Sequence, residues 1–154
     1  MNAKKTKIMK LDKTEQATHI IIGNDLIEEV NDFDYLGSLI TNSGDVIKEI
    51  KRRLGIATQK LKSMKNLWNG GNEKTKLKFV KTLIFPIATY GSETWSLSNA
   101  AEQKINAFEM RSYRKLLKVQ WTEKRTNDSI RKQLGNIPEN WLLDTILRRK
   151  LAYF

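Results

Sequence analysis

The sequence predicts a mainly α-helical fold with a small N-terminal β part, that is, an α+β chain in which strands precede a helical bundle. Three observations lead to this prediction. Short β-branched runs alternate with turn residues over the first 42 positions. A stripe of apolar residues with helical spacing then covers residues 45–68. Beyond it, apolar residues recur with the same period between breaks rich in Gly, Asn and Pro.

Composition limits the classes of function. The 154 residues include 28 Lys and Arg against 17 Asp and Glu, a net charge of +11, and a domain this basic usually binds nucleic acid. The absence of cysteine excludes disulfides and thiolate metal sites. No apolar run approaches the roughly 18 residues of a membrane span, and no signal-peptide stretch follows the N-terminus. We therefore expect an intracellular protein of the nucleus or cytoplasm, neither secreted nor bound to a membrane.

The N-terminal residues predict short strands. Residues 7–11 and 19–22 are rich in apolar and β-branched side chains, and residues 23–25 (GND) supply turn chemistry. Residues 26–30 can therefore return as the partner strand of a hairpin. Apolar and polar side chains then alternate with a period of two over residues 33–38, as in a strand.

Five acidic residues fall within ten positions of this region: Asp25, Glu28, Glu29, Asp32 and Asp34. They admit two interpretations. Converging carboxylates would hold a metal ion, whereas carboxylates scattered along a strand and a turn would form a solvated hairpin edge that resists edge-to-edge pairing. The scattered spacing favours the solvated edge.

The most regular helix is predicted over residues 45–68. Its apolar side chains follow heptad spacing over three heptads, and Ser43 or Asp45 can cap its start. Such a stripe can form a coiled coil with another chain or pack on helices of its own chain. The basic surroundings favour packing within the chain, and thus a monomer. The stripe consists of Ile47, Ile50, Leu54, Ala57, Leu61, Met64 and Trp68.

Further helices are predicted downstream. Asn72 is the candidate cap of the second helix, which Pro86 should kink or end because proline lacks a backbone donor and clashes one turn back. Asn99 begins a capping box (NAAE) for a helix that continues to about residue 119. A short helix over residues 126–134 should follow, and Pro138 should open the last helix in its first turn.

Several blocks of sequence, read together, resemble the reverse transcriptase of non-LTR (LINE-type) retrotransposons. The similarity follows one order along nearly the whole chain. The main blocks are residues 2–9 (NAKKTKIM), 33–40 (FDYLGSLI), 49–57 (EIKRRLGIA) and 90–95 (YGSETW), and residues 108–111 (FEMR) and 130–134 (IRKQL) extend them.

The resemblance implies a division into three parts. Residues 1–42 resemble the end of the palm. Residues 43–95 resemble the helical thumb, which grips the template–primer duplex by its backbone. Residues 96–154 resemble the connection that follows the thumb, here expected to be truncated.

Two elements of the palm part would position substrates in such a polymerase. Lys5 matches a lysine near the phosphates of the incoming nucleotide, with a solvated terminal arm as the alternative. Phe33, Tyr35, Leu36 and Gly37 match the primer grip, a strand-turn-strand that holds the 3′ end of the primer. Packing in the core would also explain both aromatic residues.

Basic residues off the apolar faces of the first two helices are the candidate contacts to phosphates. The expected partner is an RNA–DNA hybrid or another duplex, contacted through its backbone. The alternative is that these faces are only solvated. The residues are Lys48, Lys51, Arg52, Lys62 and Lys65 on the first helix and Lys74, Lys78 and Lys81 on the second.

The intact polymerases of this family hold two divalent metal ions such as Mg²⁺ with palm aspartates, including a Tyr/Phe-x-Asp-Asp element. No adjacent Asp-Asp pair occurs in this sequence. We therefore expect no bound cofactor or metal and no polymerase activity from this chain alone, unless the missing polymerase region acts in trans. The alternative function is a non-catalytic scaffold or protein-interaction module, with the heptad stripe or residues 141–143 (WLL) facing a partner.

Overall fold

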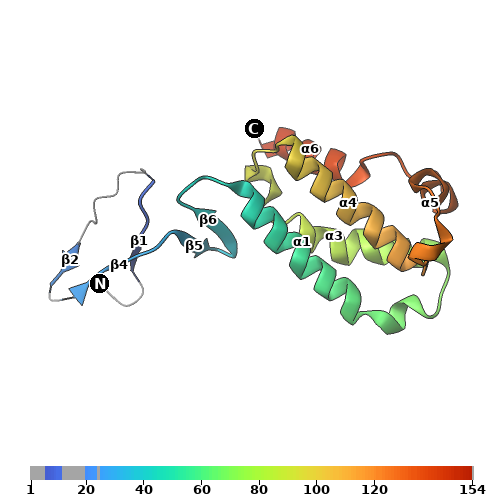
Figure 1. Cartoon of the computed structure of the whole chain (residues 1–154), viewed down its shortest axis with the longest axis horizontal. Coiled ribbons are helices and arrows are strands. Elements are labelled where there is room, and N and C mark those ends of the chain that lie inside the picture. Colours follow the sequence, from blue (N-terminus) through green and yellow to red (C-terminus); the bar gives the residue numbers. More distant parts are fainter. Residues whose placement is uncertain (1–5, 12–19, 24, 154) are drawn as a thin grey trace. The chain divides into compact units, whose positions relative to one another are not determined.

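The computed structural model of the chain describes residues 6–11, 20–23 and 25–153 (Figure 1). The chain forms two compact units, one up to Glu49 and one from Ile50 onward. Within the described residues, all strands lie in the first unit, and the helices lie in the second apart from the start of the first helix, so the predicted fold class is confirmed. Within the described ranges, no helix combines the length and apolar character needed to cross a membrane.

The strands that precede residue 30 are shorter than the runs that predicted them. β2 (Ile21–Ile22) and β3 (Asp25–Leu26) pair antiparallel, as expected for a hairpin. β1 (Lys7–Ile8) pairs in parallel with β4 (Glu28–Glu29), which the sequence pattern did not indicate. Ile21 is 65% exposed, and two-stranded ribbons with an uncovered apolar face are only marginally stable.

β5 (Asp32–Tyr35) and β6 (Ser38–Thr41) form an antiparallel hairpin in which Tyr35 pairs with Ser38. Leu36 and Gly37 lie between the strands with φ values of +48° and +81°, and a type I′ turn requires positive φ at both positions. The predicted alternation therefore ends at Tyr35. Gly37 serves the turn, since glycine adopts positive φ without steric cost.

α1 (Val46–Ser63) and a 3₁₀ turn (Lys65–Trp68) occupy the range predicted as one helix. Asp45 caps its start, because its Oδ1 accepts a hydrogen bond of 2.8 Å from the backbone N–H of Ile47. From Ile50 onward, every residue of the predicted stripe is buried or half-buried. The stripe thus packs within the chain's own helical unit.

The second helical segment runs from α2 (Glu73–Phe79) through a π-helical turn (Val80–Ile84) to α3 (Phe85–Ala88). Asn72 caps it as predicted, and its side chain accepts the backbone N–H of Thr75 at 2.8 Å. The chain stays helical through Pro86. The wider hydrogen-bond pattern of the preceding π turn accommodates a residue without a backbone donor.

α4 (Asn99–Leu116) begins one residue after its cap. The cap is Ser98, whose Oγ accepts the backbone N–H of Ala101 at 3.4 Å. The prediction of Asn99 as the cap was therefore wrong by one position, because Ser98 has the extended backbone that a cap requires and Asn99 is already helical.

The last two helices are α5 (Asn127–Gln133) and α6 (Trp141–Tyr153). Thr126 caps α5 through a hydrogen bond to Ser129. The prediction that Pro138 opens the last helix was wrong. Asn140 has φ +58°, and a left-handed residue cannot lie inside a right-handed helix, so α6 begins only after it.

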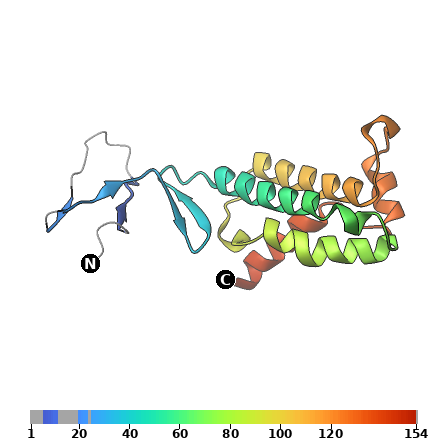
Figure 2. The same cartoon turned by 90° about the horizontal axis from the view of Figure 1, so that it is seen from below.

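The core of the helical unit is centred on Phe85. Its ring centroid lies 6.2 Å from Phe108, 6.0 Å from Tyr113 and 5.8 Å from Trp141. Because these residues come from α3, α4 and α6, the aromatic cluster joins three helices. Figures 1 and 2 show α1 lying beside α4, with the two helices running in the same direction.

Candidate nucleic-acid interface

A groove of about 410 Å³ lies between α1 and α4. Four cationic side chains line it, and no carboxylate does. Small and apolar residues form much of the remaining surface. The cations are Lys51 and Lys62 from α1 and Lys104 and Arg111 from α4, and the other lining residues include Leu54, Gly55, Ala107 and Phe108.

A second hollow of about 470 Å³ lies farther along the same two segments. Its lining again contains four cations and no carboxylate: Lys65 from the turn after α1, and Arg114, Lys115 and Lys118 from the end of α4 and just beyond it. We call the eight cations of the two hollows the basic seam. It consists of Lys51, Lys62, Lys65, Lys104, Arg111, Arg114, Lys115 and Lys118.

The seam cations keep their charge unneutralised within the described part of the chain. None of them forms an ion pair with a described carboxylate. Arg114 donates hydrogen bonds, but to neutral oxygens, the carbonyl of Arg125 and the amide of Asn127. A hollow lined by charges of one sign concentrates the field and attracts polyanions.

The predicted phosphate contacts on the first helix divide into two groups. Lys51, Lys62 and Lys65 belong to the basic seam. Lys48 lies 3.3 Å from Asp32 of β5 in an ion pair, and Arg52 is half-buried.

The predicted basic row on the second helix is not one surface. Lys74 and Lys78 are exposed but line neither hollow of the seam. Lys81 is half-buried, and its Nζ lies 4.0 Å from the centroid of the Trp141 ring, a cation–π contact. Burial lowers the pKa of Lys81, and the nearby Glu109 carboxylate partly opposes this change.

The primer-grip-like residues occupy the β5–β6 hairpin, which has the predicted strand-turn-strand form. Phe33 is half-buried, whereas Tyr35 is 57% and Leu36 77% exposed at the tip. The interpretation of Tyr35 as a core aromatic was therefore wrong, since this residue ends β5 next to the turn and most of it is exposed. Lys5 lies outside the described residues, and the roles taken from the resemblance stay predictions.

Three of the five clustered acidic residues form ion pairs with lysines, Asp32 with Lys48 as described above. Glu28 lies 3.1 Å from Lys7, and Glu29 lies 3.6 Å from Lys10. Among the residues that the structure describes, no three acidic or histidine side chains are grouped so that they could hold a metal ion.

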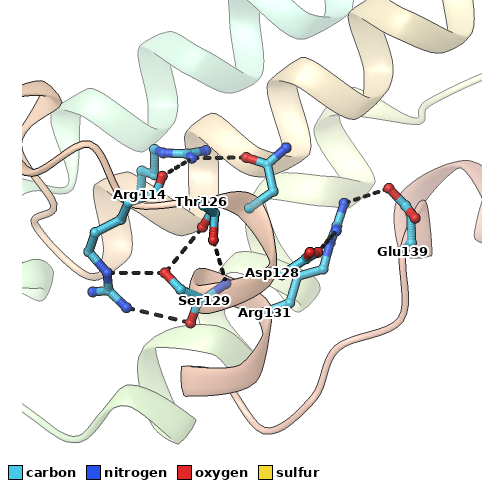
Figure 3. A network of polar contacts seen from close by, with 8 residues as sticks. Arg114, Thr126, Asp128, Ser129, Arg131 and Glu139 are labelled. Carbon is cyan, nitrogen blue, oxygen red and sulfur yellow. Dashed lines mark hydrogen bonds and ion pairs between the residues drawn. The ribbon is translucent and has the colours of Figure 1, made fainter.

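A network of polar contacts links α5 to its neighbouring segments and to Arg114 of α4 (Figure 3). Arg131 forms ion pairs of 3.0 Å with Asp128 and 3.2 Å with Glu139. Arg125 donates to Ser129 at 3.3 Å. Arg131 ties α5 to the segment before α6, and Arg125 ties α5 to the segment that precedes it. Both arginines therefore have a structural role.

A buried carboxylate joins α4 to α6. Glu109 is 3% exposed, and it accepts hydrogen bonds from the Tyr113 hydroxyl at 2.8 Å and from the backbone N–H of Leu142 at 3.0 Å. Burial raises the pKa of Glu109, and the two hydrogen bonds and the charges of Arg131 and Lys81 oppose the rise. Burial and the Glu109 charge also raise the pKa of Tyr113. Because Glu109 accepts from the first turn of α6, it holds that helix in place.

The two surfaces considered for a scaffold function are mostly interior. The heptad stripe packs within the helical unit, and in the WLL cluster Leu142 and Leu143 are 1% and 7% exposed. A protein partner would need another surface.

Sequence reasoning did not select the α4 side of the seam. Lys104, Arg111 and Lys115 are spaced by 7 and 4 residues, which places them along one face of a helix. This spacing was a usable signal. The spacing was ambiguous, because the helix dipole also favours cations near a helix C-terminus, whether or not they bind a ligand.

Comparison with known proteins gives one similarity. The chain is 23% identical over 159 aligned residues to a protein of Caenorhabditis elegans named as an uncharacterized transposon-derived protein. The match covers 99% of this chain and 57% of the relative, so the chain spans little more than half of that protein's length. No family model matches the chain, and no solved structure does.

Proposed function

We propose that the helical unit binds duplex nucleic acid, with an RNA–DNA hybrid as the principal ligand, by holding its phosphate backbone along the basic seam. The observation that carries this proposal is the gathering of eight cations along two adjoining hollows whose linings contain no carboxylate. Lysine and arginine contacts of this kind release counterions and require no base readout.

The length of the seam suits several phosphates. Lys51 and Lys65 are 14 positions apart, and at about 1.5 Å per residue they are roughly 20 Å apart along the helix axis. A duplex rises about 3.4 Å per base pair, so this length matches about six base pairs. The parallel course of α1 and α4 supplies cations on both walls of the groove (Figure 1).

We further propose that the chain derives from the reverse transcriptase of a non-LTR retrotransposon, in which residues 43–95 served as the thumb and residues 96–154 as the connection that follows it. The ordered blocks that resemble this family and the transposon-derived name of the C. elegans relative support this origin. On this proposal the chain does not polymerise by itself. Polymerisation would need a palm with its metal-binding aspartates, and the proposed place of action is the nucleus or the cytoplasm.

The salt dependence of binding tests the proposal. Fluorescence anisotropy would measure the affinity for a labelled RNA–DNA hybrid over a series of KCl concentrations. If about five phosphates are neutralised, the logarithm of the affinity falls with the logarithm of the salt concentration with a slope of roughly −4 to −5. Hybrids of unrelated sequence should bind alike. A salt-independent affinity, or no binding at low salt, would contradict the proposal.

A further inference from the structure

Trp121 is the most exposed large apolar side chain in the described part of the chain. It is 90% exposed, whereas Trp68 and Trp95 are 2% and 3% exposed and Trp141 is half-buried within the aromatic cluster. The core therefore makes no use of this indole. A large aromatic side chain left in water offers a flat surface to a ligand.

The turn that carries Trp121 is held firmly. It is a 3₁₀ turn (Trp121–Glu123) closed by a reciprocal capping box. The backbone N–H of Gln120 donates to Glu123 Oε1 at 2.7 Å, and the backbone N–H of Glu123 donates back to the Gln120 side chain. The backbone under the indole is thus fixed, and only two side-chain torsions remain to be ordered when a ligand binds.

The indole adjoins the second hollow of the basic seam. Lys118, Val119 and Gln120, the three residues before Trp121, all line that hollow. Lys124 follows the turn and is exposed. Glu123 is the one nearby acid of the turn, and its carboxylate is engaged in the capping box. The surroundings of Trp121 therefore favour an occupant that is both anionic and aromatic.

We propose that Trp121 is a stacking platform for an unpaired base of single-stranded nucleic acid whose phosphates lie against the second hollow. A duplex shields the faces of its bases, so backbone contacts along the seam leave the indole unused. An unpaired base presents its face, and aromatic stacking of this kind tolerates any sequence. For its phosphate contacts the inference rests on the proposed function, but it adds a second ligand class and a residue for it.

Two variants of one residue test the inference. Trp121→Leu keeps an apolar side chain but removes the aromatic face on which a base could stack. Trp121→Phe keeps a smaller aromatic face. Affinities of both variants and the wild type would be measured for a short oligothymidylate and for a blunt RNA–DNA hybrid at low salt. We expect Trp121→Leu to bind the oligothymidylate about tenfold more weakly, with the hybrid affinity unchanged and most of the loss restored in Trp121→Phe.

Each other outcome has a defined meaning. An equal loss for both ligands, or no loss for either, overturns the stacking role. Binding of the hybrid without the oligothymidylate also overturns it and leaves the proposed function standing. If the wild type binds neither ligand, both the stacking role and the proposed function are contradicted. If the wild type sediments as a dimer and Trp121→Leu as a monomer, the indole serves a protein contact and the inference fails. Because Trp121 is 90% exposed, the substitutions should leave the circular dichroism spectrum unchanged.

Discussion

Helix α4 divides the cations of the helical unit into two kinds. On the side facing α5, arginines have partners: Arg131 lies between Asp128 and Glu139, and Arg125 donates to Ser129 (Figure 3). On the side facing α1, the four cations of the groove gather without a carboxylate in its lining, whereas Arg114 at the end of the seam also joins the α5 network through Arg125 and Asn127. Cations with fixed partners stabilise the fold, whereas gathered cations without partners suit an external polyanion. Substitutions on the two sides should therefore have different consequences.

The largest effect on stability is expected at the buried carboxylate. Glu109→Ala leaves the Tyr113 hydroxyl and the Leu142 N–H without their acceptor in the interior. We expect the free energy of unfolding to fall by about 2–4 kcal/mol. Urea denaturation would measure it. Glu139→Ala is the control, since this side chain is 71% exposed and its loss should cost at most about 1 kcal/mol. Equal costs for the two variants would contradict the structural role of Glu109.

The same carboxylate predicts a pH dependence. Burial raises the pKa of Glu109 above its ordinary value of 4.5, so the folded chain holds this proton more tightly than the unfolded chain. The contribution of protonated Glu109 to the free energy of unfolding is fully present below the pKa that Glu109 has in the unfolded chain. It is lost as the pH rises through the pKa that Glu109 has in the folded chain. The difference in unfolding free energy between the wild type and Glu109→Gln should therefore decrease as the pH rises from 4.5 toward neutrality. A difference that increases over this interval would refute the assignment.

Substitution of Arg131 on α5 tests the structural role of the cations that have fixed partners. Its side chain is 12% exposed and pairs with two carboxylates. Arg131→Ala should lower the free energy of unfolding by about 1 kcal/mol and leave the affinity for the hybrid unchanged. Lys132→Ala, at an exposed neighbouring position of α5, removes the same charge and should change neither quantity. If Arg131→Ala weakens hybrid binding while the fold persists, the division into two kinds of cation is wrong.

A smaller and opposite effect is expected at the seam itself. Gly55 lies within α1, lines the groove, and has no atom within 4 Å of the position that a Cβ would take. Gly55→Ala should raise the free energy of unfolding by about 0.5–1 kcal/mol, because alanine favours the helix over the unfolded chain. Thermal denaturation would measure the gain. A loss of stability would mean that the Gly55 site is more crowded than the structure shows.

Local signals accounted for most of the helical fold. The α1 stripe and the Asn72 cap could be predicted because the residues that decide them are close in sequence. The parallel pairing of β1 with β4 could not, because it joins segments about 20 residues apart without a pattern in either. The late start of α6 depends on the left-handed conformation of Asn140. Asparagine can adopt this conformation, but its presence in a sequence does not predict it.

The candidate site was predictable only on the α1 side. Lys51 and Lys62 lie outside the apolar stripe of α1, and this pattern can be recognised within a single helix. Lys104 and Arg111 become their neighbours only when α4 packs beside α1. Lys81 is half-buried because it packs against the ring of Trp141, which lies 60 positions away in the sequence. Periodicity identifies the exposed face of a helix, but tertiary packing decides which exposed faces meet.

Two double variants with the same loss of charge test the central claim most directly. Lys62→Gln with Lys104→Gln removes one cation from each wall of the groove, whereas Lys74→Gln with Lys78→Gln removes two exposed cations of α2 that line neither hollow. For an RNA–DNA hybrid, the seam variant should make the slope of log affinity against log salt shallower by about 2, at roughly 0.9 per phosphate contact. The α2 variant should keep the wild-type slope. Equal changes in the two slopes, or a larger change in the α2 variant, would contradict the assignment of the basic seam.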